Sequence, residues 1–547
     1  MAKKLIAVFR ARFGIVAAVV IVLLAALAWH NRFVQDDAFI SFRYSQNFVE
    51  GHGLVWNVGE RVEGYTNFLW VLLVSGALYL GIEPVGFTYV VGIICFILSL
   101  IFAFKIAEML LRSKDWALLA VILLGTNYSF SSYATGGLET QLQTCLFAAT
   151  IWLLLAGMEA GEWTIRRLTA ISVLLSAAIL TRPDSVLLAA VVLPTIAFHL
   201  WRSRAEKAKK AATLGLPLLI IVGSWLAWKV SYYGDILPNT FYAKVSSVAD
   251  YKLGLRYLYL FLFSYWLFPF ALTVPAAIIR GLRKPNAKAL ILASMTALWL
   301  LYVVKVGGDF MEFRMFVPVM PFIVVLMIWS VLILTRWKLV HVGMVLLLVM
   351  GSMAHARHSA EGACSTLGLC HVETIPILSS HLCDPLENWV GIGKALGEAF
   401  GDGSDVTVAV VPAGAIPYYS RMKCIDMIGL NDKWIARHGE ILPLRMAGHK
   451  RRSTFAHLVS RGVSLVIGHP IIVAPLGAEF QGFPPNFDLH FVYGIRASDE
   501  VPRGTSLLVI PIDDTSGVLA FYVKRSLAVE RAIDENGWQI VPLDAHR

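Results

Sequence analysis

Charged residues are scarce in this 547-residue chain, at 15%, whereas hydrophobic residues make up 57% of it. A typical soluble domain is about 25% charged, so the composition excludes that class and indicates a polytopic membrane protein. The chain also lacks an internal repeat, a low-complexity linker and a CxxC pair. The missing CxxC spacing argues against a structural zinc site, even with His371 and His381 near the later cysteines.

The positive charge of the chain does not indicate nucleic-acid binding. The formal net charge is +10, but the basic residues lie in short clusters between apolar runs, and no nucleic-acid-reading motif accompanies them. Such clusters are typical of cytoplasmic loops that face anionic lipid. We therefore expect membrane lipids, and no nucleic acid, as partners. The clusters are 3–12, 105–114, 166–167, 202–210, 280–288 and 336–338.

Apolar stretches of near twenty residues are long enough to cross a bilayer. When every basic cluster is placed in the cytoplasm, one path predicts about eleven spans, with the N-terminus inside and the C-terminus outside. The first apolar core is long and has no clear cleavage site, so we interpret it as a retained helix rather than a signal peptide. The predicted spans are 13–31, 86–110, 116–131, 138–157, 168–182, 185–201, 212–230, 257–280, 289–304, 316–335 and 337–354.

One apolar segment, 68–81, does not fit this path. A full crossing there would move the basic cluster at 105–114, and every later cluster, to the outside. We therefore interpret 68–81 as an interfacial or re-entrant helix. The first extracytoplasmic loop then covers residues 31–85.

The composition becomes that of an ordinary globular domain after residue 354. β-Branched runs at 406–412 and 463–468 alternate with a helix-like stretch at 387–400, which predicts a mixed α/β fold. We therefore expect a transmembrane domain at 1–354 and an extracytoplasmic α/β domain at 355–547. Four cysteines in an oxidising compartment indicate two disulfides, with three pairings open: Cys364, Cys370, Cys383 and Cys424.

Two adjacent aspartates, Asp36 and Asp37, follow the first predicted span. Either could cap the helix that comes next, because a carboxylate accepts the free N–H groups of a helix start. A cap needs only one aspartate, however, and ionisable groups at membrane depth are functional by default. We therefore expect one carboxylate to cap or orient, while the other faces a cavity as a base.

Three cations in other outside loops are candidates for binding a phosphate: Arg182, Lys244 and Arg314. The forked donors of Arg314 match phosphate geometry, and Lys244 suits a phosphate as a point charge. Structural ion pairs are the alternative, between Arg182 and Asp184 or between Arg314 and either Asp309 or Glu312.

Further side chains in these loops are candidates for sugar or acceptor contacts. Glu63 and Asn67 suit hydroxyl groups, while Tyr65 suits either the membrane interface or a sugar-stacking surface. Glu139 precedes a predicted helix, where it could act as a simple dipole cap. The full set is Glu63, Tyr65, Asn67, Glu139, Asn239 and Asp309.

Seven segments, in order from about 35 to 435, resemble the C-type (GT-C) superfamily of integral membrane glycosyltransferases. They are DDAFISFRYSQNF, GHGLVWNVGERVEGYTNFLW, GGLET, TRPDS, LPNTFYAK, GGDFMEFRMFVPVMP and AGAIPYYSRMKCIDMIGLND. The resemblance is strongest to bacterial terminal β-(1→2)-arabinofuranosyltransferases. It implies a multi-pass protein of the bacterial cytoplasmic (inner) membrane that acts in cell-envelope biosynthesis. Glu312 and the cysteines that open the C-terminal domain depart from the family pattern.

The resemblance also implies a reaction. A sugar, with arabinofuranose favoured, would pass from a polyprenyl-phosphate donor to an extracytoplasmic glycan, glycolipid or glycoprotein, with inversion at the anomeric carbon. One aspartate of the pair, with Asp36 slightly favoured, would take the proton of the acceptor hydroxyl. Arg314, Arg182 and Lys244 would stabilise the charge on the leaving phosphate.

Other interpretations stay open at this point. A divalent cation fits the chemistry, since Asp36, Asp37 and Asp309 could supply oxygen ligands, but no spacing demands one. The chain could also be a transporter or flippase of lipid-linked sugars, or a non-catalytic assembly factor. Many transporters show repeated halves or broken paired helices, and neither is recognisable in the sequence.

Overall fold

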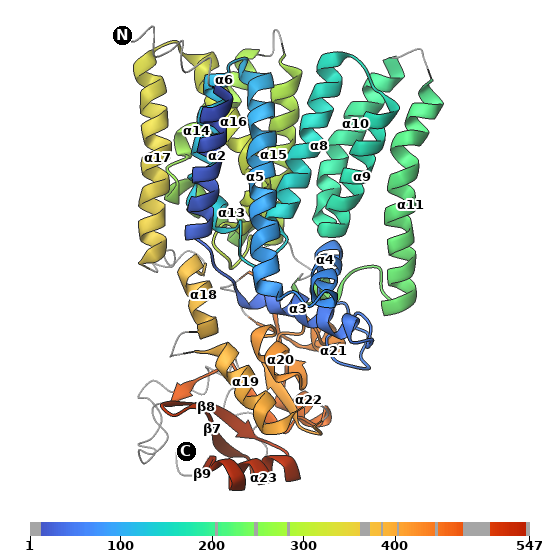
Figure 1. Ribbon diagram of the computed structural model, residues 1–547, viewed down its shortest axis with the longest axis vertical. Helices are drawn as coiled ribbons and strands as arrows, with labels where there is room; N and C mark the ends of the chain where they lie inside the picture. Colours follow the sequence, from blue (N-terminus) through green and yellow to red (C-terminus); the bar gives the residue numbers. More distant parts are fainter. Residues whose placement is uncertain are drawn as a thin grey trace.

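The computed structural model describes residues 13–202, 206–244, 250–281, 285–361, 372–383, 387–401, 404–442, 447–473 and 504–542. Figure 1 shows a bundle of long helices with a smaller domain at one end of it. The bundle comprises α2 (Phe13–His30), α5 (Pro84–Leu111), α6 (Lys114–Gly125), α8 (Thr140–Ala160), α9 (Ile165–Thr181), α10 (Val186–Arg202), α11 (Lys207–Tyr233), α13 (Tyr251–Ser264), α14 (Phe268–Arg280), α15 (Ala287–Val306), α16 (Met320–Leu334) and α17 (Lys338–Ala360). Shorter elements are α3 (Asp36–Val49), α4 (Phe68–Tyr79), α7 (Tyr128–Ser132), α12 (Asn239–Lys244), η1 (Pro183–Ser185) and η3 (Arg314–Val319).

The predicted spans all fall on helices of this bundle. Among the described residues, eight helices are long and apolar enough to cross a membrane, or nine if one bent pair counts as a span. The predicted span 116–131 covers most of α6, which has 12 residues, and most of α7, and the predicted span 168–182 corresponds to α9, which has 17 residues. Neither α6 nor α9 is among the eight helices, so these two crossings stay predictions. The expected polytopic helical fold is confirmed.

The predicted span 257–280 is not one straight helix. Its residues form α13 and α14, which meet at an angle of 100°. Trp266 lies between them with a φ of +56°, outside the helical region. Pro269, in the first turn of α14, has no N–H with which to continue the hydrogen-bond ladder of α13. The apolar composition that predicted the span does not reveal such a break.

The segment predicted as interfacial is a short helix. α4 has 12 residues, about 18 Å at 1.5 Å per residue, and cannot cross a hydrocarbon core about 30 Å thick. It packs against α3 at the end of the bundle that faces the C-terminal domain (Figure 1).

The C-terminal domain is built on a mixed seven-stranded sheet. Its order is β2-β1-β5-β8-β7-β9, with β6 beside β8; β1 pairs in parallel with β2 and β5, and the other pairings are antiparallel. The predicted runs at 406–412, 463–468 and 387–400 are confirmed as β1, β5 and α19. The strands are β1 (Thr407–Val410), β2 (Lys423–Asp426), β5 (Leu465–Gly468), β6 (Ile472–Val473), β7 (Ser506–Asp513), β8 (Ser516–Tyr522) and β9 (Gln539–Pro542), with a separate pair of β3 (Glu440–Ile441) and β4 (Arg451–Arg452). The helices are α18 (Ile375–Cys383), α19 (Trp389–Phe400), α20 (Ala415–Ser420), α21 (Lys433–His438), α22 (Phe455–Ser460) and α23 (Leu527–Asn536).

A buried arginine of α3 fastens this domain to the bundle. Arg43 is 6% exposed, and its guanidinium donates to the carbonyls of Trp56 and Met422, both at 2.6 Å, and to the carbonyl of Pro417. Charge-assisted bonds in a buried setting are among the stronger hydrogen bonds. The domain boundary predicted at 354/355 stays a prediction, and α17 runs past it to Ala360.

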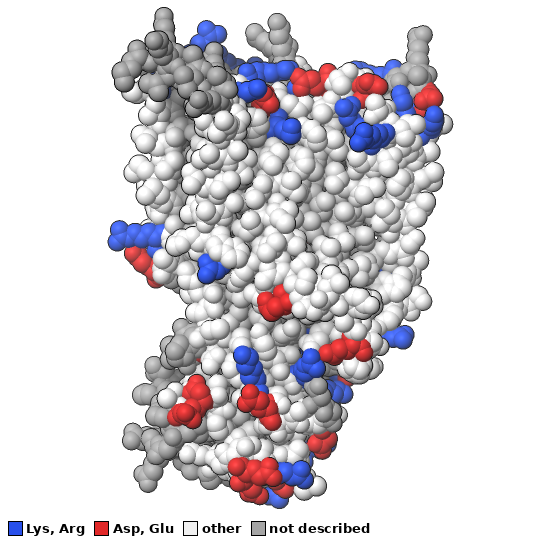
Figure 2. Space-filling view, viewed as in Figure 1, with Lys and Arg blue, Asp and Glu red and all other residues white. Residues whose placement is uncertain are grey.

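Basic side chains gather at the end of the bundle opposite the C-terminal domain (Figure 2). The end of α5 and the start of α9, which flank two of the basic clusters, lie at that end (Figure 1). The clusters at 105–114 and 166–167 thus lie at the same end of the bundle, as the predicted path requires. Which side is cytoplasmic stays a prediction.

The predicted pair of disulfides is wrong for two of its cysteines. Cys383 and Cys424 both have free thiols. Cys424 is buried on β2 next to Arg43 of α3, whereas Cys383 is exposed at the end of α18, so the two side chains lie in different surroundings. Cys364 and Cys370 lie outside the described residues.

Candidate active site

Asp36 and Asp37 form the first turn of α3, but neither caps this helix. The N-cap position is Gln35, which makes no side-chain cap bond. Asp36 instead caps a different helix: its two carboxylate oxygens accept the N–H groups of Gly414, at 3.0 Å, and Ala415, at 2.7 Å, where α20 begins. The expectation of a cap on the next helix is therefore wrong, and the cap joins α3 to the C-terminal domain.

This position leaves Asp36 without an open oxygen. Both oxygens are engaged by backbone donors, and the side chain is buried. Burial raises the pKa of Asp36 to about 7, although the two N–H bonds act in the opposite direction. A carboxylate held in this way fits the orienting role better than that of a base.

Asp37 has different surroundings. Its side chain is half-buried, and no described residue forms a hydrogen bond or ion pair with its carboxylate. It lines two neighbouring cavities, and its charge acts on Arg314 in one of them and on His449 in the other. Asp37 is therefore the member of the pair that a substrate could reach.

The first of these cavities, called here the large cavity, has a volume of about 310 Å³ and lies where α3, α4, α8, α12 and η3 approach one another. Residues far apart in the sequence meet in its wall. Eight of the predicted site residues line it: Asp37, Tyr65, Asn67, Glu139, Arg182, Lys244, Asp309 and Arg314. Asp184 and Tyr302, which the sequence did not single out as site residues, line it as well.

Both arginines of the large cavity have acidic partners. Arg182 contacts Glu139 and Asp184, each at 2.8 Å, and Arg314 contacts Asp309 at 2.7 Å. These carboxylates fix the guanidinium groups in place, as the alternative of structural ion pairs predicted. A ligand phosphate would meet cations that are already oriented.

Lys244, at the end of α12, is the cation of this cavity that forms no ion pair with any described residue. Four acids and three bases line the cavity, so the positive field there is local to each cation. An incoming anion would therefore gain the most electrostatic stabilisation near Lys244 and at the outer edge of the arginines.

Three predicted site residues lie away from the large cavity. Asp36 caps α20, as described above. Glu63 is buried in an ion pair with Lys229 of α11, at 2.8 Å. Asn239 donates to the carbonyls of Gly429 and Leu430, at 2.9 and 3.0 Å, and so helps to attach the C-terminal domain. Their predicted sugar contacts are untested, and the positions of Glu63 and Asn239 favour structural roles.

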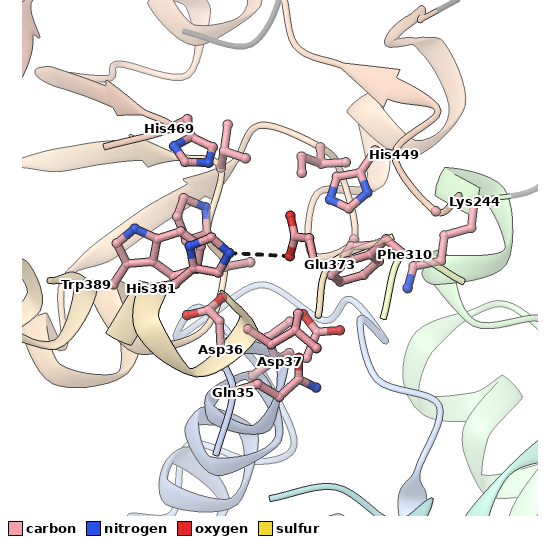
Figure 3. A pocket seen from close by; sticks show the side chains of 18 residues that line it. Gln35, Asp36, Asp37, Lys244, Phe310, Glu373, His381, Trp389, His449 and His469 are labelled. Atoms are coloured by element: carbon pink, nitrogen blue, oxygen red, sulfur yellow. Dashed lines mark hydrogen bonds and ion pairs between the residues drawn. The ribbon is translucent and has the colours of Figure 1, made fainter. Parts of the chain in front are cut away.

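The second cavity, called here the junction cavity, lies between α3 and the C-terminal domain (Figure 3). Its volume is about 80 Å³. Most of its polar lining was missed by the sequence reasoning, because a histidine or tryptophan in a domain of ordinary composition carries no distinguishing signal. These missed residues are Gln35, Glu373, His381, Trp389, His449 and His469.

His381 is the centre of a charged cluster in this wall. Its ring contacts Glu373, at 3.3 Å, and Glu387, and it stacks on the indole of Trp389 with a centroid distance of 4.6 Å. Burial alone would lower its pKa, but the two carboxylates raise the pKa of His381 to about 10. The imidazole is therefore a cation at neutral pH. In contrast, burial and the charge of Lys244 hold the pKa of His449 below its ordinary value.

A metal site is not apparent in the part of the chain that the structure describes. No group of three or more His, Cys, Asp or Glu residues is arranged there to hold an ion. Two of the three expected ligands also have other partners, because Asp36 accepts an N–H group at the start of α20 and Asp309 pairs with Arg314. Metal dependence stays untested.

Comparison with protein families gives two matches. Residues 69–228 match the family described as dolichyl-phosphate-mannose-protein mannosyltransferase. Residues 386–502 match a domain of unknown function, DUF8728. The first match covers α4 to α11 of the bundle, and the second lies within the C-terminal domain.

Two curated relatives carry the same description. The chain is 24% identical over 330 residues to the terminal β-(1→2)-arabinofuranosyltransferase of Mycobacterium tuberculosis, covering 52% of this chain and 51% of the relative. It is 27% identical over 327 residues to that of Corynebacterium glutamicum, covering 52% of this chain and 46% of the relative. The chain thus spans about half the length of the curated relatives it matches.

Solved structures share the fold. ArnT from Cupriavidus metallidurans, bound to undecaprenyl phosphate, aligns with a TM-score of 0.53 and 13% identity over 93% of this chain and 98% of that one. The oligosaccharyltransferase of Archaeoglobus fulgidus, without ligand, aligns with a TM-score of 0.52 and 11% identity over 93% of this chain and 74% of that one. The chain therefore has the fold of the C-type integral membrane glycosyltransferases, and the resemblance of its motifs to the terminal β-(1→2)-arabinofuranosyltransferases is confirmed.

Proposed function

We propose that this protein is a glycosyltransferase that moves arabinofuranose from a polyprenyl-phosphate donor to an extracytoplasmic glycan acceptor. The observation that carries the proposal is the large cavity, which is lined by Asp37, Arg182, Lys244 and Arg314 and in which the carboxylate of Asp37 has no partner among the described residues. An acid open to substrate beside separate cations suits a displacement with an anionic leaving group. The names of the curated relatives support the choice of sugar.

In the proposed reaction, Asp37 takes the proton of an acceptor hydroxyl as that oxygen bonds to the anomeric carbon. The bond between this carbon and the phosphate oxygen breaks on the opposite face, and the electron pair leaves with polyprenyl phosphate. The configuration at the anomeric carbon is thereby inverted. We assign the base to Asp37 rather than Asp36, because both oxygens of Asp36 already accept backbone N–H groups.

The cations act on the leaving group. Lys244 has no acidic partner among the described residues, so it can turn toward a phosphate without breaking an ion pair. Arg314 and Arg182 keep their guanidinium groups in place through Asp309, Glu139 and Asp184. Preorganised donors of this kind stabilise developing charge without reorganisation. Removing one would be expected to cost about 10²-fold or more in turnover.

The proposed setting is a bacterial cytoplasmic membrane, with the C-terminal domain on the outer face.

Transport of lipid-linked sugars is the rival function. A transporter needs polar groups along a path through the bundle, whereas the two polar cavities described here both lie at the end next to the C-terminal domain. A further cavity, of about 360 Å³ among α13 to α16, is lined almost wholly by apolar side chains. This distribution of polar groups favours sugar transfer over transport.

The test is an assay of purified protein in nanodiscs with radiolabelled polyprenyl-phosphate arabinofuranose and a neutral arabinofuranose oligosaccharide. We expect transfer by the natural protein and a loss of about 10²- to 10⁴-fold in kcat for Asp37→Asn, the usual contribution of a general base. Donor affinity should be retained, because the substitution leaves the three cations in place. Parallel assays with Mg²⁺ and with EDTA determine metal dependence.

Asp36→Asn is the matched control. An asparagine oxygen can still accept one of the two N–H groups of α20, so we expect a loss of stability and only a modest loss of turnover. Full activity in Asp37→Asn would overturn the assignment of the base. Absence of transfer by the natural protein, together with movement of the labelled lipid across a vesicle membrane, would favour the transporter.

A further inference from the structure

Phe313, the residue before Arg314, has a strained backbone. Its φ is +47°, in the left-handed region that a bulky side chain rarely adopts. Such a conformation costs free energy and persists only where the surrounding structure holds it. The side chain is fully buried at the start of η3. The reason for this turn must therefore lie in the contacts on either side of it.

Glu312 anchors the N-terminal side of the turn. Its side chain is fully buried, and one carboxylate oxygen accepts from Ser359, at 2.6 Å, and from the N–H of Ile375, at 2.9 Å. The other oxygen contacts His355 of α17 at 2.6 Å. Burying a carboxylate costs free energy that these bonds offset. Two elements, α17 and the start of α18, thus fix the position of Glu312.

The backbone on both sides of the turn is fixed as well. The N–H of Glu312 donates to the carbonyl of Glu373, at 3.1 Å, and the N–H of Glu373 donates to the carbonyl of Phe310, at 2.7 Å. After the turn, the indole of Trp299 donates to the carbonyl of Met315 at 2.6 Å. The turn therefore has an anchor on each side, and its backbone has little freedom to relax.

The turn directs neighbouring side chains to different places. Glu312 meets the buried groups of α17, whereas Arg314 lines the large cavity. Two nitrogens of the Arg314 guanidinium contact Asp309, at 2.7 and 2.9 Å. Asp309 belongs to the same loop, however, so this pair alone does not fix the guanidinium relative to the rest of the cavity. An anchor outside the loop is needed, and Glu312 provides it.

We propose that Glu312 is a positioning residue for the donor phosphate. By holding the turn at Phe313, it keeps the Arg314 guanidinium at the wall of the large cavity, where the phosphate binds. This inference rests on the proposed function and adds a residue that touches no substrate, because Glu312 is fully buried and lies outside the lining of that cavity. Preorganised donors bind an anion with less loss of conformational freedom. A loosened turn should therefore weaken binding of a lipid phosphate.

The test measures binding of undecaprenyl phosphate to the protein in nanodiscs, which requires no sugar transfer. We expect the dissociation constant to rise about tenfold in Glu312→Ala, the equivalent of weakening one hydrogen bond to a charged group. In Glu312→Gln the rise should stay below about threefold, because the amide oxygen can accept from Ser359 and Ile375 while the amide nitrogen donates to His355. If Glu312→Ala does not yield folded protein, Glu312→Asp replaces it, because the shorter side chain cannot make these contacts together.

A double-mutant cycle with Arg314→Gln separates positioning from a general loss of stability. If Glu312 acts through Arg314, Glu312→Ala should change the dissociation constant by less than about twofold once Arg314 is replaced. A purely structural role would give the same change in both backgrounds. That result would overturn the inference.

Arg43→Met is the matched control. Arg43 is also buried and also joins the bundle to the C-terminal domain, but it lies outside the lining of the large cavity. We expect it to lower stability and to change the dissociation constant by less than about twofold. A rise equal to that in Glu312→Ala would show that any loosening of the domain weakens binding, and the inference would fail.

The outcomes for the inference and for the proposed function can be told apart. Unchanged lipid binding in Glu312→Ala, with sugar transfer by the natural protein, would overturn the inference and uphold the proposed function. Lipid binding without transfer by the natural protein would overturn the proposed function, and the cycle would still decide the inference. Absence of both lipid binding and transfer in the natural protein would overturn the two proposals together.

Discussion

Asp36 and Asp37 are neighbours in the chain, and α3 turns their carboxylates toward different surroundings. Successive residues of a helix point about 100° apart, so one side chain can enter the domain interface while the next faces a cavity. Asp36 meets the N–H groups of Gly414 and Ala415, and Asp37 meets none that the structure describes. At Gly414 an added Cβ would lie 1.9 Å from the carbonyl oxygen of Asp36, which requires glycine there.

The buried Asp36 should make stability depend on pH. Its pKa is about 7 in the folded protein, against 3.8 for an exposed aspartate. Because the folded state binds this proton more tightly, the contribution of Asp36 is fully present below about pH 4 and is lost as pH rises through 7. In Asp36→Asn this loss should be absent. Between low and high pH, the contribution of Asp36 changes by at most about 4 kcal/mol of unfolding free energy, at 1.36 kcal/mol for each pKa unit.

The measurement compares thermal unfolding midpoints of the natural protein and Asp36→Asn in detergent between pH 4.5 and 7.5. Glu63 also has a pKa raised to about 7 by burial, but it is present in both proteins, so its effect cancels in the difference. Parallel curves for the two proteins would show that Asp36 does not titrate in this range.

At the scale of elements, Glu312 joins four segments through one buried carboxylate. The side chain is fully buried and contacts His355 and Ser359 of α17, each at 2.6 Å, the N–H of Ile375 at 2.9 Å, and Ser129 of α7 at 3.3 Å. Its backbone N–H donates to the carbonyl of Glu373 at 3.1 Å. This single residue therefore ties the loop that carries Asp309 and Arg314 to α17 and to the C-terminal domain.

We expect Glu312→Ala to be strongly destabilising. The substitution leaves His355, Ser359 and the Ile375 N–H buried without their acceptor, and breaking such a buried group typically costs about 3–5 kcal/mol. Glu361→Ala, at the residue that follows α17, is the control, because the exposed pair of Glu361 with Arg357 should contribute less than about 1 kcal/mol. Unfolding in a denaturing detergent series measures both. Equal losses in the two variants would contradict a structural role for Glu312.

At the scale of the whole molecule, the C-terminal domain forms most of the wall of the junction cavity, and it adds Leu430 and Gly448 to the wall of the large cavity. Arg43 and Asp36 of α3 and Asn239 of α12 each form hydrogen bonds with backbone atoms of that domain. The basic clusters lie at the opposite end of the bundle (Figure 2). If those clusters are cytoplasmic, the site and the C-terminal domain lie together on the outer face.

Cysteine labelling tests this orientation. In a background without Cys364, Cys370 and Cys383, we expect Glu440→Cys in the C-terminal domain to react with a membrane-impermeant maleimide in intact spheroplasts. Arg112→Cys, at the exposed end of α5, should react only after permeabilisation. Both positions are on the surface, so access to the reagent and not burial decides the result. Labelling of Arg112→Cys in intact spheroplasts would overturn the predicted path.

The sequence was enough to predict the helical bundle, the short helix at 68–81 and the α/β fold of the last part. Hydropathy and strand periodicity are local properties, since burial in lipid or in a sheet acts on each stretch separately. The bend between α13 and α14 was missed, because it depends on the backbone of Trp266 and on one proline. The disulfides were predicted from a cysteine count, which carries no information on which thiols meet.

The sequence by itself determined which polar residues near the membrane are candidates for a functional site, because placing polar groups there costs free energy. Eight of these candidates line one cavity. Only the tertiary structure decided which role each of these residues has. It assigned Asp36 to a domain contact and paired both arginines with acids, while within the described residues Asp37 and Lys244 have no partner of opposite charge. It also brought Trp389 and Glu373 to within reach of α3. These outcomes depend on contacts between residues hundreds of positions apart, which no local pattern in the chain encodes.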